Sequence, residues 1–170
     1  MRKQPPMKQS SPDNYQSPKE SINILIPFLD KSWTIWECAE GKGNLVKAFK
    51  EKGFNITGSD IITNGVDFLD NLTPPKFDCI VTNPPYSVKE KFIERCYKLN
   101  KPFALLMPLT ALESEKRQKF YREYGVQLII PNKRYNFETP DGKGGGAWFL
   151  TMWLTWGLNL PKDINFVNIR

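Results

Sequence analysis

Short runs of strand-forming residues alternate with helical segments along most of this chain, and that alternation limits the folds open to it. Strand–helix–strand units join parallel strands through right-handed crossovers and place helices on both faces of a sheet. Strands are predicted at 34–39, 54–61, 66–69, 77–82, 103–109, 126–131 and 147–156, with helices at 18–29, 44–52, 88–99 and 113–124. The last two strands have no helix between them and should form an antiparallel hairpin. The expected fold is α/β, with a mainly parallel seven-stranded sheet.

Local signals refine the ends of the first two helices and the extent of the domain. Ser17 is expected to cap the first helix, with Pro18 at its first position, and Pro27 should distort its last turn. Gly53 is expected to end the second helix in a left-handed conformation. Residues 1–14 are polar and lack periodicity, which predicts a flexible basic tail. Residues 15–170 are predicted to form a single domain.

Composition removes several kinds of active site. The chain has no histidine, which excludes a Ser-His-Asp triad, a Cys-His dyad and a histidine-ligated metal ion. The three cysteines, Cys38, Cys79 and Cys96, form no C-x-x-C pair and are expected to be small buried hydrophobic side chains. No metal site is therefore predicted.

Charge and hydropathy bear on partners and location. The net charge of +6 at pH 7 suits a polyanionic partner but does not require one. The chain has no run of about 18 apolar residues, so no membrane-spanning helix is predicted. Its N-terminus has no apolar segment of the kind found in secretory signals. A cytoplasmic location is expected.

Three predicted strands end in residues suited to bind a nucleoside, at the position where open α/β sheets bind ligands. The first strand runs into Glu37-Cys-Ala-Glu-Gly-Lys-Gly43, which matches neither the G-x-G-x-x-G nor the G-x-x-x-x-G-K-[ST] pattern. Alone, that loop could be an ordinary strand-to-helix turn. The second strand ends in Gly58-Ser-Asp60, and the Asp60 carboxylate suits both ribose hydroxyls, or a turn cap. Asp67 and Phe68 suit an adenine amino group and ring, or a turn beside a core phenylalanine.

The tetrapeptide Asn83-Pro84-Pro85-Tyr86 follows the fourth predicted strand. Two prolines fix the backbone, lack N–H groups and leave carbonyls free to accept hydrogen bonds. The Asn83 side-chain oxygen and the Pro84 carbonyl can then accept both hydrogens of one planar NH₂ group, which frees the nitrogen lone pair for attack on a methyl group. Tyr86 would stack on the ring that carries the amine. The alternative reading is a rigid turn after a strand.

These motifs together resemble class I S-adenosylmethionine-dependent methyltransferases of the amino-methylating branch, above all small phage- or prophage-type DNA adenine-N6 methyltransferases. The resemblance covers about residues 15–156 and rests on NPPY, with support from ECAEGKGN, GSDI, VDFL and AWF. It implies a Rossmann-like class I methyltransferase fold, S-adenosylmethionine as cofactor and a location in a phage-infected or bacterial cell. The catalytic residues that it implies are Asn83, Pro84, Pro85 and Tyr86. The cofactor-binding residues that it implies are Tyr15, Ser17, Glu37, Ala39, Gly41, Gly43, Asp60, Ile61, Asp67, Phe68 and Asn83.

The chain departs from that family in having no room for a separate target-recognition region, since 62–78 and 87–101 are too short. A base in a duplex would have to be flipped out of the stack, which needs phosphate anchors. Lys133, Arg134 and Lys143 flank a glycine-rich loop and are candidate nucleic-acid contacts, or solvated charges of a hairpin loop. The leading prediction is methylation of adenine N6 in DNA. The alternatives are an RNA base, a protein glutamine amide, or an inactive binding protein with this fold.

Overall fold

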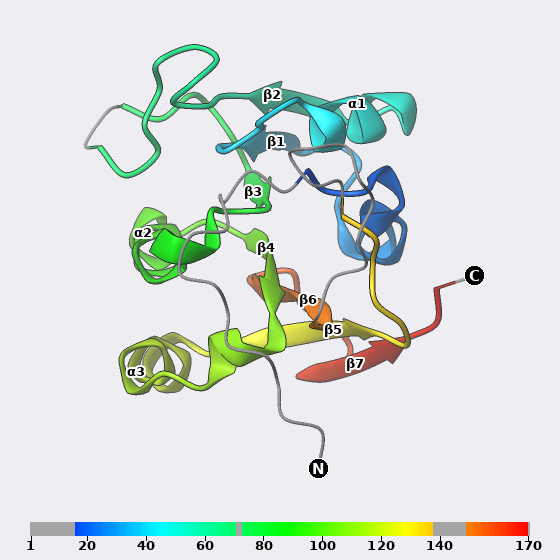
Figure 1. Ribbon diagram of the computed structural model, residues 1–170, viewed down its shortest axis with the longest axis vertical. Helices are drawn as coiled ribbons and strands as arrows, with labels where there is room; N and C mark the ends of the chain where they lie inside the picture. The colour runs from blue at the N-terminus through cyan, green and yellow to red at the C-terminus, as the bar shows by residue number, and fades with distance from the viewer. Residues whose placement is uncertain (1–15, 71–72, 138–148, 170) are drawn as a thin grey trace.

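The computed structural model describes residues 16–70, 73–137 and 149–169, and every structural statement below concerns these residues. A seven-stranded sheet has the order β2-β1-β3-β4-β6-β5-β7 and runs from the top to the bottom of Figure 1. Its strands are β1 (Thr34–Glu37), β2 (Asn55–Gly58), β3 (Cys79–Thr82), β4 (Phe103–Pro108), β5 (Gln127–Pro131), β6 (Thr151–Trp156) and β7 (Ile164–Val167). The helices are η1 (Lys19–Ile24), η2 (Ile26–Phe28), α1 (Asn44–Glu51), η3 (Tyr86–Val88), α2 (Lys89–Leu99), η4 (Leu109–Leu112) and α3 (Glu115–Tyr124).

All strands of the sheet except β6 run in one direction. Strand β1 pairs in parallel with β2 and β3, and β3 pairs in parallel with β4. Strand β6 lies between β4 and β5 and is antiparallel to both, while β7 adds in parallel to the outer side of β5. The mainly parallel sheet and the antiparallel pairing of the strands at 126–131 and 147–156 are thus confirmed.

Helices cover both faces of the sheet, as predicted. Alternate strand residues pack into two separate cores, because successive side chains of a strand point to opposite faces. One core joins the sheet to η1 and α1, and the other joins it to α2 and η4, with α3 packed against it. In Figure 1, α1 and the N-terminal 3₁₀ turns accordingly lie on one side of the sheet, while α2 and α3 lie on the other. The cysteines are buried and free, also as predicted.

One predicted strand is absent and one observed strand was not predicted, so the total of seven strands is unchanged. Residues 66–69 form turns rather than a strand: the Asp67 carboxylate accepts the Leu69 N–H at 2.9 Å, and such a local bond favours a turn over a sheet ladder. The unpredicted strand is β7, a four-residue edge strand whose Ile164 and Phe166 are exposed, so it lacks the apolar run of the central strands.

The first predicted helix forms as two 3₁₀ helices, η1 and η2, rather than one α-helix. Pro27 lies within η2 and has no N–H to donate to an i−4 carbonyl, which explains the break. Pro18, with an extended ψ of 137°, is the N-cap residue, so the prediction of Ser17 at that position was wrong by one residue. Gly53 does have the expected left-handed φ, of 75°. The predicted tail at 1–14 lies outside the described residues.

The buried Trp153 ties β6 to η1 and yields a first prediction. Its indole N–H donates to the buried Ser21 carbonyl at 2.9 Å. Trp153→Phe removes this buried hydrogen bond between β6 and η1, so the free energy of unfolding should fall by about 0.5–1.5 kcal/mol. Trp156→Phe is the control, because its N–H donates at 2.8 Å to the carbonyl of the exposed Tyr124, where water can replace it. Equal losses for both variants in urea denaturation would contradict the assignment.

Candidate functional site

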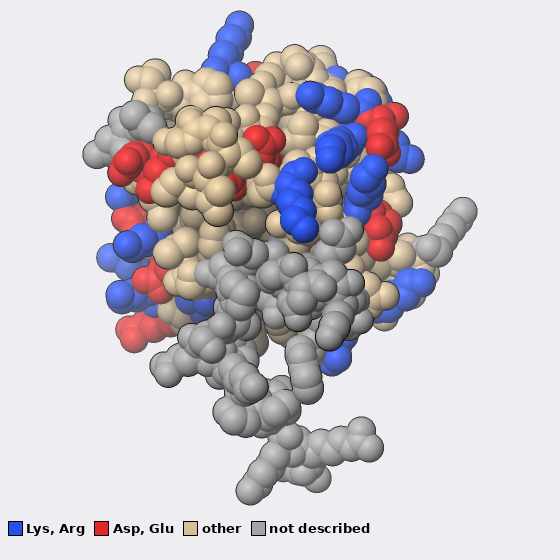
Figure 2. Space-filling view, turned by 45° about the horizontal axis from the view of Figure 1, so that its top comes forward, with Lys and Arg blue, Asp and Glu red and all other residues tan. Residues whose placement is uncertain are grey.

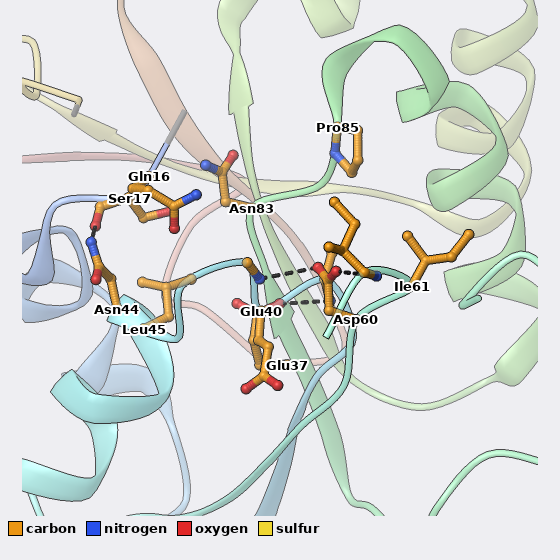
Figure 3. Close-up of a pocket in the computed structure, with 13 residues that line it drawn as sticks. Gln16, Ser17, Glu37, Glu40, Asn44, Leu45, Asp60, Ile61, Asn83 and Pro85 are labelled. Carbon is orange, nitrogen blue, oxygen red and sulfur yellow. Dashed lines mark hydrogen bonds between the residues drawn. The ribbon is translucent and has the colours of Figure 1, made fainter. Parts of the chain in front are cut away.

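A hollow lies where the carboxyl ends of β1, β2 and β3 meet (Figure 3), which is the switch point of the strand order. It opens to solvent and has a volume of about 130 Å³. Glu37, Asp60 and Asn83 reach it from the ends of the three strands. The lining residues are Gln16, Ser17, Glu37, Ala39, Glu40, Gly41, Asn44, Leu45, Asp60, Ile61, Ile62, Asn83 and Pro85.

Most of the residues predicted from the sequence come together here. Those that line the hollow are Ser17, Glu37, Ala39, Gly41, Asp60, Ile61, Asn83 and Pro85. Those that do not line it are Gly43, Asp67, Phe68, Pro84 and Tyr86. Tyr15 and Lys143 lie outside the described residues. The structure adds Gln16, Glu40, Asn44, Leu45 and Ile62, which the sequence reading missed.

The Asp60 carboxylate joins two of the loops that form the hollow. One of its oxygens accepts the Gly41 N–H at 3.1 Å, and the other accepts the Ile62 N–H at 2.8 Å (dashed in Figure 3). An ionised carboxylate has about four acceptor sites, so these two bonds leave capacity for two further donors. Asp60 therefore acts as a turn cap and still has acceptor sites for hydroxyl groups of a ligand.

The glycine-rich loop after β1 is shaped by left-handed backbone and by close contacts. Gly41 has a φ of +53°, and a Cβ there would lie 3.0 Å from the Gln16 side-chain oxygen. Gly43 has a φ of +77° with open space around it, so only its backbone conformation calls for glycine. Gly43 is also the N-cap residue of α1 and does not line the hollow.

Glu40 lies over the end of β2. A Cβ added to Gly58 would come within 1.9 Å of a Glu40 carboxylate oxygen, so the two residues are fitted to each other. The Glu40 N–H donates to the Ser59 carbonyl at 3.0 Å, and the Ser59 N–H donates to the Glu37 carbonyl at 2.8 Å. A glycine inside a strand often marks such a close approach, so Gly58 was a signal that could have pointed to Glu40.

Residues 16 and 17 close the hollow on the side of η1. The Gln16 side-chain oxygen accepts the Lys42 N–H at 3.0 Å, and the Asn44 amide donates to the Ser17 carbonyl at 3.3 Å. These bonds join the start of the described chain to the glycine-rich loop. Both partners are remote in sequence, which is why no local pattern indicated Gln16.

Glu37 places a buried carboxyl in the wall of the hollow. Only 1% of the residue is exposed, and one of its side-chain oxygens accepts the Ala39 N–H at 3.0 Å. Burial raises the pKa of Glu37 from its ordinary value of 4.5 to about 8, and the nearby carboxylates of Glu40 and Asp60 add to the rise. Around neutral pH this carboxyl therefore holds a proton that a cationic ligand would displace.

Asn83 and Pro85 form the part of the hollow beyond β3. The Asn83 side-chain oxygen is buried and accepts no hydrogen bond within the described residues. Pro84 is buried behind it. Tyr86 begins η3, with its ring edge-on to Phe149 at 5.9 Å between centroids, and its carbonyl accepts the Lys89 ammonium at 3.0 Å. A buried acceptor that lacks a donor can accept a hydrogen bond from an amino group of a ligand.

Asp67 and Phe68 are directed elsewhere. Phe68 is buried between Trp36 and Phe92, with centroid distances of 5.4 and 4.7 Å, and the Arg95 guanidinium lies 5.2 Å from its ring. Asp67 caps its own turn through Leu69. The geometry is that of a turn aspartate beside a core phenylalanine.

Lys133 and Arg134 follow β5 and are exposed. Because β5 runs parallel to β1, they lie at the same edge of the sheet as the hollow. The part of the chain described here contains no helix long and apolar enough to cross a membrane.

Comparisons with known proteins relate this fold to methyltransferases. No family model matches the chain, and no curated protein matches it in sequence. Among solved structures, the modification subunit of a putative type I restriction enzyme from Vibrio vulnificus has a TM-score of 0.56 at 12% identity and covers 83% of this chain and 44% of its own. The ribosomal protein L11 methylase from Lactobacillus delbrueckii subsp. bulgaricus has a TM-score of 0.54 at 14% identity, over 91% of this chain and 90% of its own. The glycopeptide N-methyltransferase MtfA has a TM-score of 0.52 at 12% identity, over 82% and 90%.

These likenesses define the fold class. The chain has the Rossmann-like fold of class I methyltransferases, a mostly parallel sheet with one antiparallel strand, β6, which is third from one edge. It spans less than half the length of the restriction-enzyme subunit, since it covers 44% of that protein.

The raised pKa of Glu37 predicts a dependence of stability on pH. In the folded state the carboxyl keeps its proton up to a pH of about 8, whereas the unfolded chain loses it near 4.5. The contribution of Glu37 to stability is therefore complete below about 4.5 and is lost as the pH rises to about 8. Glu37→Gln, which stays neutral, should remove this loss, on the order of 3 kcal/mol, from urea denaturation series run between pH 5 and 8.5.

The matched control is Glu115→Gln, which neutralises an exposed carboxyl on α3. It should leave the pH dependence of unfolding in place. If Glu37→Gln and the wild-type chain showed parallel stability curves over this range, the buried carboxyl would not be protonated in the folded protein.

Proposed function

We propose that this chain is an S-adenosylmethionine-dependent methyltransferase that acts on an exocyclic amino group, with adenine N6 in DNA as its substrate. The observation that carries the proposal is the buried Asn83 oxygen, an acceptor with no hydrogen bond in the described residues, in the wall of a hollow shared with Asp60 and the glycine-rich loop. The fold agrees, since the solved structures similar to it include the modification subunit of a putative type I restriction enzyme and a glycopeptide N-methyltransferase.

The hollow suits the nucleoside part of S-adenosylmethionine. The Asp60 carboxylate keeps two acceptor sites after its bonds to Gly41 and Ile62, which matches two ribose hydroxyls. Ile61 is 59% exposed beside it and offers an apolar surface to a base. We assign the adenine surface to Ile61 rather than to Phe68, because Phe68 is buried in the core and does not line the hollow.

The other end of the hollow suits a cationic group. Glu37 and Glu40 also line the hollow, at the start of the glycine-rich loop, and carry two further carboxyl groups. The cofactor carries an ammonium group and a sulfonium, whose methyl is the group transferred. A cation near Glu37 favours the ionised form of that carboxyl and so compensates for its burial. Residues 16 and 17, which are bonded to the glycine-rich loop, close this end, and we include Ser17 and the preceding Tyr15 in the site.

Asn83 and Pro84 prepare the amine. The Asn83 oxygen accepts one hydrogen of the substrate NH₂ group and the Pro84 carbonyl accepts the other, so the nitrogen lone pair is withdrawn from the ring and directed at the methyl. Pro84 and Pro85 hold this backbone rigid. Tyr86, at the start of η3, supplies an aromatic surface for the base. As the N–C bond forms, the C–S bond of the sulfonium would break and S-adenosylhomocysteine would leave as a neutral thioether. No histidine is needed, because the substituted nitrogen can lose its proton to solvent afterwards and positioning of the amine contributes to the rate.

Nucleic acid is the acceptor that the charges favour. The chain has a net charge of +6, and the exposed Lys133 and Arg134 lie at the edge of the sheet where the hollow opens. Lys143, which lies outside the described residues, completes the predicted set. The acceptor can be identified by incubating the protein with tritiated S-adenosylmethionine and DNA, RNA and protein fractions, followed by mass spectrometry of the labelled base. Label in RNA or in protein alone would replace the DNA assignment.

Asn83→Ala tests the catalytic role. Loss of the acceptor misplaces the amine, so the rate of methyl transfer should fall by about 100-fold or more, with little change in cofactor affinity. Asn55→Ala is the control, because Asn55 is exposed on β2 and its amide bonds only Thr34 at 3.0 Å. Full activity of the Asn83 variant in the tritium assay would exclude the mechanism.

Asp60→Ala tests the ribose-binding role. Removing a charged acceptor should weaken cofactor binding by about 1–3 kcal/mol in calorimetry. Asp78→Ala is the matched control, because that carboxylate also accepts a backbone N–H, from Thr34 at 2.8 Å, but does not line the hollow. Unchanged affinity in the Asp60 variant, or an equal loss in both, would remove Asp60 from the cofactor site.

A further inference from the structure

Helix α1 carries a row of lysines on its outer side. Its apolar residues Leu45, Val46, Ala48 and Phe49 are buried against the sheet. Lys47 and Lys50, three residues apart, share the exposed face, and Lys42 is exposed in the loop that leads into the helix. We call Lys42, Lys47 and Lys50 the lysine ridge. Figure 2 shows basic side chains gathered on the side of the molecule where α1 lies.

The lysine ridge is not neutralised by neighbouring carboxylates, because none of its members forms an ion pair within the described residues. Glu51 lies four residues after Lys47 and would be its natural helical partner. Instead, the Glu51 carboxylate lies 2.8 Å from the Lys19 ammonium. On α2 and α3, by contrast, Lys98 pairs with Glu94 at 2.7 Å and Lys116 with Glu90 at 3.5 Å. Within the described residues, Lys42, Lys47 and Lys50 are thus not paired with a carboxylate.

The ridge begins at the edge of the hollow. Lys42 lies between Gly41, which lines the hollow, and Gly43, which caps α1, and its N–H is held by Gln16. Lys47 and Lys50 lie about one helical turn apart, and at a rise of about 1.5 Å per residue the three steps between them span roughly 4.5 Å. One strand of a duplex carries a phosphate for about every 3.4 Å of its axis, so this spacing suits roughly two neighbouring phosphates.

We infer that the lysine ridge binds the sugar-phosphate backbone of the nucleic acid whose base enters the hollow, an inference that rests on the proposed function. Lysine is a flexible point charge, suited to phosphates in any register. Contacts of this kind give affinity and orientation without reading sequence. The ridge and the pair Lys133–Arg134 lie on different elements, α1 and the end of β5, and so provide two separate basic groups.

The burial of α1 argues against a membrane as the partner. A helix that binds a lipid surface presents apolar side chains that insert between headgroups. In α1 those side chains are in the core, with Phe49 fully buried and Leu45 only 2% exposed. The free face of the helix offers charge alone, which fits a hydrophilic polyanion.

The double variant K47Q/K50Q tests the ridge while leaving Lys42 and the hollow intact. Its affinity for a fluorescein-labelled 20-mer, duplex and single-stranded, is measured by anisotropy from about 50 to 200 mM salt. The slope of log affinity against log salt should fall by about two, one per lost phosphate contact. The wild-type chain should then weaken roughly tenfold more than the variant over this range, while cofactor affinity stays the same.

The control K119Q/K162Q removes the same charge from exposed lysines on α3 and before β7, neither of them in an ion pair of the described residues. It should keep the wild-type slope. If the slope of log affinity against log salt fell equally in both double variants, net charge and not the ridge would be responsible, and the inference would be wrong. A wild-type chain that methylates nucleic acid with an unchanged slope in K47Q/K50Q would overturn the ridge alone, whereas methylation of protein only would overturn the proposed function as well.

Discussion

The candidate site depends on the Asp60 carboxylate, which joins the end of β2 to the glycine-rich loop after β1. Its bonds to the N–H groups of Gly41 and Ile62, at 3.1 and 2.8 Å, hold two loops in a fixed relation. The loop can approach because Gly41 adopts a left-handed φ that other residues rarely adopt. Backbone bonds from Glu40 to Ser59 and from Ser59 to Glu37 join the same two segments. The carboxylate that joins the two loops is therefore the same one that we propose binds the ribose.

A second constraint is the concentration of acidic groups within the hollow. Glu37 is buried, with its pKa raised to about 8, and Glu40 and Asp60 contribute to the rise. Such an arrangement is unfavourable in the free protein, because burial opposes ionisation. A cationic ligand reverses the balance by stabilising the ionised form. The sulfonium and ammonium of the proposed cofactor are cations of this kind, and their binding near Glu37 would stabilise its ionised carboxylate.

The sequence predicted the sheet and much of the site because both follow from local patterns. Strand–helix alternation determines the parallel order, and that order brings Glu37, Asp60 and Asn83 to one edge. The failures have physical causes. Asp67 caps its own turn and breaks the expected strand at 66–69, and Pro27 helps split the first helix into 3₁₀ turns. Gln16 and Glu40 were missed because their partners, Lys42 and Gly58, are remote in sequence.

The charges of the molecule are separated in a way that suits a small cation and a large anion at adjoining places. Three acidic residues, Glu37, Glu40 and Asp60, line the hollow, where they attract a cation at short range. The lysine ridge faces outward into solvent, where attraction for a polyanion is long-range and weakened by salt. Lys42 lies between the two regions, with its backbone in the glycine-rich loop and its side chain exposed. One loop can therefore hold the cofactor on one side and guide a phosphate backbone on the other.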